Sequence, residues 1–135
     1  MIHLDEVDNV YISEELAGYA KKLVQDGVFP RQVDLLLLGF AYAVDKGLTP
    51  PERIPRHDLV RAGSIERDMR LALEATAHWY TRQDAGSAIE DEKRLLDFVC
   101  RLASKGVEVL KLEWEGKSKS QIELSVLCLA SISEL

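Results

Sequence analysis

The spacing of apolar residues predicts a chain built mainly of helices. After Val10–Ile12, apolar side chains recur three or four positions apart between Leu16 and Val24. This spacing is typical of one face of an amphipathic helix. Ser13 is suited to cap the start of this helix, and Gly27 is suited to end it.

The segment 31–46 predicts a second helix of a different kind. Its apolar side chains leave little of the helical surface polar, and Gly47 follows its end. A helix that is apolar nearly all round belongs in the centre of a fold. Gly39 within it costs helical stability, and we interpret it as a point of close contact with another helix.

Residues 48–63 are expected to form a long irregular loop over the end of this central helix. Pro50, Pro51 and Pro55 oppose a regular helix there. A loop of this length in a compact domain often serves a function.

Three further helices are expected after the loop. Ser64 would cap one that runs to about residue 82, and the pair Ser87 and Glu90 would begin the next, which Gly106 would end. Ser120 and Glu123 form a second capping pair for a last helix. The residues 107–135 favour helix, with a hairpin around 116–119 as the open alternative.

These patterns together predict an all-α fold. We expect a single compact domain of about five helices around the central helix 31–46, with a domain spanning 10–135. Residues 1–9 would form an acidic N-terminal arm, since the first 15 residues hold five acids and no base. Such an arm is usually solvated, and it can also dock a basic partner.

Composition narrows the class of protein. A chain of 135 residues, 47% hydrophobic and 30% charged, fits one domain with a core and excludes wholesale disorder. Its net charge of −6 argues against coating nucleic acid by bulk charge. No apolar run approaches a membrane span, and no basic segment precedes the first apolar one. We therefore expect a cytoplasmic protein with no membrane contact.

No catalytic motif is present in the sequence. It has no phosphate-binding loop, dinucleotide-binding glycine pattern, nucleophile elbow or zinc-protease motif. Cys100 and Cys128 lack metal-ligand spacing, so we expect no metal and no cofactor, and the sequence favours a non-enzyme. The alternative is a small enzyme that uses His57 and Asp58 as general acid and base.

Arginines are the most notable charged residues. Arginine side chains suit phosphates and carboxylates, and these five are candidate partner- or phosphate-binding residues: Arg53, Arg56, Arg61, Arg67 and Arg70. Acids alternate with them along the chain, so local salt bridges are the other interpretation.

Part of the chain resembles a known family. The segment DGVFPRQVDLLLLGFAYAVDKGLTPPERIP is similar to a pattern in small accessory proteins encoded beside prokaryotic DNA-phosphorothioation (Dnd) defence systems. Phe29, Asp34, Phe40, Ala43 and Gly47 occupy the matching places, and LLDFVCRLASKGVEVLKLEWEG resembles the helices that close such proteins. The resemblance implies a non-enzymatic adaptor that docks onto a larger protein of a DNA-modification or anti-phage defence complex.

Two other expectations concern partners. Residues 10–47 also resemble ribbon-helix-helix DNA-binding repressors and antitoxins, in which a short strand before two helices pairs with that of a second copy. Acids rather than bases precede the strand here, so we expect nucleic acid to be contacted only indirectly. Self-association into a homo-oligomer is a further expectation, because exposed helices would carry Trp or Tyr.

Overall fold

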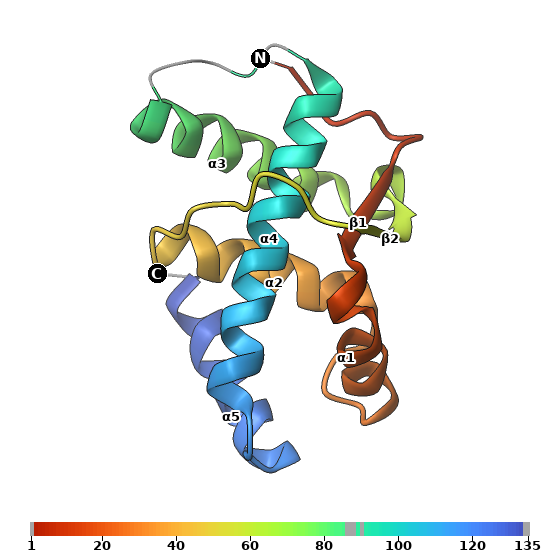
Figure 1. The fold of residues 1–135 in the computed structure, drawn as a ribbon, viewed down its shortest axis with the longest axis vertical. Coiled ribbons are helices and arrows are strands. Elements are labelled where there is room, and N and C mark those ends of the chain that lie inside the picture. The colour runs from red at the N-terminus through yellow and green to blue at the C-terminus, as the bar shows by residue number, and fades with distance from the viewer. Residues whose placement is uncertain (1, 86–88, 90, 134–135) are drawn as a thin grey trace.

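The computed structural model describes residues 2–85, 89 and 91–133, and Figure 1 shows the arrangement of its elements. In chain order these are β1 (Asn9–Ser13), α1 (Glu14–Gln25), α2 (Gln32–Asp45), β2 (Arg56–Arg61), a short 3-10 turn (Ala62–Ser64), α3 (Arg67–Ala85), α4 (Glu92–Trp114) and α5 (Lys119–Ser133). The long helix α4 runs through the middle of the molecule, and α5 returns beside its lower half (Figure 1).

The expectation of an all-α fold is wrong, because five helices are joined by a two-stranded antiparallel sheet. The strand β2 lies inside the segment expected to be an irregular loop. The prolines keep the chain extended only as far as Pro55, and the Leu59-Val60 pair then packs against the core. Between Val10 and Tyr11 the register shifts by one residue, which forms a β-bulge.

Two glycines set the distance between α2 and α4. A Cβ added to Gly106 would lie 1.8 Å from the carbonyl oxygen of Gly39, so the two helix backbones touch. This contact confirms the interpretation of Gly39 as a point of close approach. Gly106 was expected to end a helix, and that expectation is wrong. It lies inside α4, which continues to Trp114, so residues 107–114 are helical and the hairpin alternative is wrong as well.

The sheet packs against α4 through one edge of β1. The backbone N–H groups of Tyr11 and Ser13 donate to Cys100 Sγ at 3.4 Å and to Ser104 Oγ at 3.0 Å. Both acceptors lie one helical turn apart on α4, so they meet alternate residues of the strand. The edge of β1 that β2 leaves open is thereby covered by a helix of the same chain.

The acidic N-terminal segment lies along α3 instead of extending into solvent. Leu4 is buried, and its backbone N–H donates to Glu74 Oε1 at 2.9 Å. His3 Nδ1 lies 2.7 Å from the other oxygen of the same buried carboxylate, and the ring of His78 contacts the carbonyl oxygen of Ile2 at 3.0 Å. These contacts differ from the expected solvated arm.

Several helix ends differ from the expected caps. Ser13 precedes α1, but its side chain makes no capping hydrogen bond. The end of β2 and the 3-10 turn occupy the residues around Ser64, so α3 begins only at Arg67. Ser118 and Gln121 cap α5 reciprocally, two residues before the expected pair. The Ser87 and Glu90 pair lies outside the described residues.

Candidate functional site

The structure distributes the five candidate arginines over β2, α3 and the segment before β2, with Arg67 and Arg70 on α3. Arg56 and Arg61 lie at opposite ends of β2, paired in register with Ser13 and Asn9. Arg53 lies in the segment before the strand. The set therefore does not form one continuous patch on the sheet.

Two of these arginines have ionic partners in the described residues. Arg70 Nη1 lies 3.1 Å from Glu6 Oε1, an ion pair without hydrogen-bond alignment, and it fastens the N-terminal segment to α3. Arg56 pairs with Asp58 at 3.4 Å. The exposed side chains of Arg53, Arg61 and Arg67 have no ion-pair partner among the described residues.

The side chains of the proposed acid–base pair, His57 and Asp58, do not face each other. His57 and Asp58 are neighbours on an exposed strand, so their side chains leave opposite faces of the sheet. Asp58 instead accepts from Asn9 and Arg56, and His57 lines neither of the two cavities described below. Within residues 2–85, 89 and 91–133, no group of three His, Cys, Asp or Glu residues is placed to hold a metal ion.

An open apolar groove with a volume of about 680 Å³ lies on the described surface. Its floor is a stripe along α2, where residues three or four apart share a face. The floor residues are Leu37, Leu38, Ala41 and Val44. From Asp34 to Asp45 the floor spans about 16 Å, which is the length of three helical turns.

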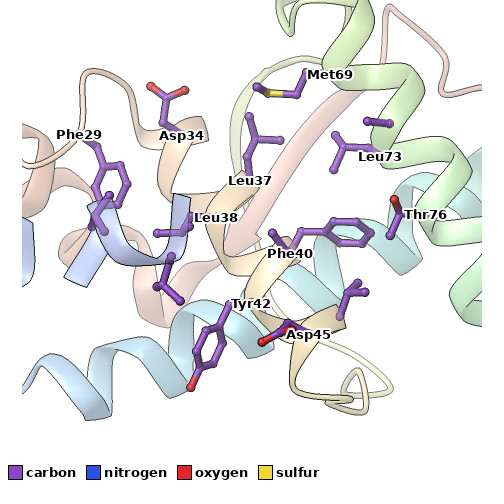
Figure 2. Close-up of a pocket in the computed structure, with 15 residues that line it drawn as sticks. Phe29, Asp34, Leu37, Leu38, Phe40, Tyr42, Asp45, Met69, Leu73 and Thr76 are labelled. Atoms are coloured by element: carbon purple, nitrogen blue, oxygen red, sulfur yellow. The ribbon is translucent and has the colours of Figure 1, made fainter. Parts of the chain in front are cut away.

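Two other helices form the walls of the groove. Met69, Leu73 and Thr76 of α3 lie on one side, one helical turn apart. Met69 and Leu73 point toward Leu37 of α2 (Figure 2). Val126 and Leu129 of α5 lie on the other side. The groove therefore depends on three helices that are far apart in the sequence.

Charge in the groove is of one sign. Among the described residues, Asp34 and Asp45 are the carboxylates that line it, and no Lys, Arg or His does. Asp34 is held by Arg31 at 2.9 Å, whereas Asp45 is exposed at the far end of α2. Near that end, burial raises the pKa of Tyr42 to about 12, and its hydroxyl donates to Glu113 at 2.5 Å. The groove is thus apolar with an acidic rim.

A second, polar cavity of about 430 Å³ lies between the sheet and the start of α4. Its lining combines three cations with two carboxylates: Arg56, Lys93, Arg94, Asp8 and Asp97. Tyr11 donates a short hydrogen bond to Asp97, and Arg101 binds the same carboxylate at 2.9 Å. Burial, followed by the hydrogen bond to Asp97, raises the pKa of the Tyr11 phenol far above its ordinary value.

Sequence reasoning missed both cavities. The α2 stripe was interpreted as core, because nothing in the pattern shows that part of an all-apolar helix is left uncovered. Lys93 and Arg94 were not singled out, since their nearness to Arg56 exists only once β2 pairs with β1, which packs against α4. The one feature of the sequence that could have predicted a groove wall is the spacing of Met69, Leu73 and Thr76, which puts them on one face of α3.

Comparisons of the chain with family models, curated proteins and solved structures give no match. None of the helices in the described residues has the length and apolar character that crossing a bilayer requires.

Proposed function

We propose that the protein is a non-enzymatic docking protein whose apolar groove holds an amphipathic helix of a larger partner protein. The observation that carries this proposal is the groove itself, an uncovered apolar surface bounded by α2, α3 and α5. Helix-in-groove binding uses apolar side chains at positions i, i+3, i+4 and i+7, and a floor of about three turns offers matching contacts.

The exposure of the groove's own side chains supports this role. Met69 is 43% exposed and Ala41 is exposed, although both are apolar and lie beside a well-formed core. Apolar surface that stays in contact with water lowers stability relative to burial by about 25 cal/mol per Å². Contiguous patches of this kind mark interaction sites more often than scattered single residues do.

The acidic rim indicates which helix fits. A partner helix with Lys or Arg flanking its apolar face would place opposite charges near Asp45, and near Asp34 and Glu66, which share the single cation of Arg31. Charge complementarity at the rim chiefly selects partners and speeds association. We therefore propose a helix with basic flanks as the occupant.

The identity of the partner is a separate part of the proposal. From the resemblance in residues 26–55 and 95–116, we propose that the partner belongs to a DNA-phosphorothioation or related defence complex. The neighbouring genes and the native complex are the observations that bear on this part, and the groove does not depend on it.

A defined peptide tests the groove directly. The probe is a synthetic helical peptide with Leu at i, i+3, i+4 and i+7 and Lys elsewhere, and its matched control carries Glu in place of Lys. Fluorescence anisotropy should show binding of the Lys peptide with a Kd on the order of micromolar, and at least about ten-fold weaker binding of the Glu peptide. Equal binding of the two peptides would contradict the role of the acidic rim.

A pair of variants distinguishes peptide binding in the groove from nonspecific binding elsewhere on the surface. Ala41→Arg places a long cation on the groove floor at an exposed helical position, and it should weaken Lys-peptide binding by about ten-fold or more. Leu112→Arg introduces the same side chain at an exposed position of α4 that lies outside the groove, and it should leave binding unchanged. If both variants bind as the wild type does, the groove is not the docking site.

A second copy of the chain is the occupant that this proposal excludes. Light scattering coupled to size exclusion should give the monomer mass without peptide. A dimer that Ala41→Arg dissociates and Leu112→Arg does not would overturn the proposal of a separate partner.

One structural observation separates this role from the ribbon-helix-helix alternative. In that arrangement the strand before the two helices pairs with its counterpart in a second copy. Here β1 pairs with β2 of the same chain, and its other edge donates to Cys100 and Ser104 of α4. We therefore favour docking over direct reading of DNA.

A further inference from the structure

We propose that the polar cavity between the sheet and the start of α4 binds the phosphate group of a small ligand. This site is independent of the docking groove, since the two cavities share no lining residue. Its volume of about 430 Å³ falls in the range of pockets that hold small molecules, roughly 300–1,000 Å³.

The charges of the cavity favour an anion. Asp97 is already bonded to Tyr11 and Arg101, so its charge is largely compensated. Lys93 and Arg94 are exposed and have no ion-pair partner among the described residues. Asp8 is the other carboxylate in the lining and offsets one of these two cations, so the cavity keeps an excess of positive charge on a chain whose net charge is −6.

The guanidinium of Arg56 is held in a fixed position. Its Cζ lies 4.2 Å from the centre of the buried Tyr11 ring, which is itself tied to Asp97. Its one ionic contact is a long pair with exposed Asp58. A planar guanidinium that is already ordered loses little freedom when it binds two phosphate oxygens.

The position of Lys93 and Arg94 adds to this preference. Both belong to the first turn of α4, where the helix dipole favours negative charge. Asp91 caps the backbone N–H of Lys93 at 2.8 Å, so the side chains rather than the backbone amides would hold the phosphate.

A small ligand fits this cavity better than a nucleic acid. Asp8 borders the cavity and would repel the adjacent phosphates of a continuous backbone. The basic groups are also confined to one cavity instead of forming a stripe along a helix.

Titrations monitored by ¹H–¹⁵N NMR test this proposal. The probes are inorganic phosphate, adenosine 5′-monophosphate and a 20-base-pair DNA duplex. We expect saturable shifts of the Tyr11 and Lys93 amides with phosphate or the nucleotide, at a Kd on the order of 1 mM or below at low salt. Tighter binding of the nucleotide than of phosphate would identify a phosphate ester as the ligand, and equal binding would identify the free ion.

Two double variants with the same change in net charge control for bulk electrostatics. Lys93→Ala/Arg94→Ala should weaken binding by about ten-fold or more, whereas Arg53→Ala/Arg67→Ala should change it by less than about two-fold. All four side chains are exposed, and circular dichroism checks that the fold is kept. Equal weakening by both variants, no saturable shift, or tightest binding of the duplex through Lys93 and Arg94 would each overturn the proposal.

Discussion

At the scale of single residues, the described core uses polar side chains where backbone groups need partners. Cys100 and Ser104 are buried on α4, and each accepts a hydrogen bond from β1. Glu74 is buried on α3, and it accepts from the backbone of Leu4. A buried N–H without an acceptor costs about 1–3 kcal/mol, so these side chains fix where the strand and the N-terminal segment lie.

Cys100 gives a prediction on alkaline stability. Burial raises the pKa of its thiol from 9.0 to about 12. The folded-state pKa lies above that of the unfolded chain, so the protonated thiol contributes to the stability of the fold. This contribution is complete below pH 9 and is lost as the pH rises toward 12. Cys100→Ser keeps an acceptor for Tyr11 but does not titrate. The free energy of unfolding of this variant, measured with urea, should therefore fall less steeply with rising pH than that of the wild type. The two slopes should differ by up to about 1.4 kcal/mol per pH unit.

The exposed thiol provides the control for this prediction. Cys128→Ser should leave the wild-type slope unchanged, because Cys128 is exposed in the structure. If Cys100→Ser and the wild type lose stability in parallel between pH 9 and 11, the thiol is not buried as described.

At the scale of elements, the crossing of α2 and α4 organises the molecule. The floor of the groove is on α2, and the cations of the polar cavity are on α4 and β2. Gly39 and Gly106 let the backbones of these two helices touch. The position of both cavities therefore depends on this contact.

Substitutions at two helical glycines test the contact. Gly106→Ala would place a Cβ against the backbone of Gly39, and we expect a loss of about 1–3 kcal/mol or more in the free energy of unfolding. Gly18 is an exposed position of α1, and a Cβ added there would have no neighbouring atom within 4 Å. Gly18→Ala should therefore raise the free energy of unfolding by about 0.5–1 kcal/mol through helix propensity. Urea denaturation measures both, and a stabilising Gly106→Ala would rule out the helix crossing described above.

At the scale of the whole molecule, the sequence predicted the helices and their number better than their assembly. The apolar period identified the helix at 32–45, and Gly39 identified its contact with another helix, because both depend on local pattern and size. The sheet was missed since β2 begins with Arg56, His57 and Asp58, which lack the alternating apolar pattern of a strand, and its pairing with β1 is a long-range contact. The groove was missed because coverage of an apolar helix is a tertiary property.

The central claim is that the groove between α2, α3 and α5 is where a partner helix docks. A ¹H–¹⁵N NMR titration with the Lys-bearing amphipathic peptide tests it most directly. We expect saturable shifts at the groove residues of α2, at Met69–Thr76 and at Val126–Leu129, with little change at β1 and β2. Shifts centred on the sheet, or none at saturating peptide, would contradict the claim.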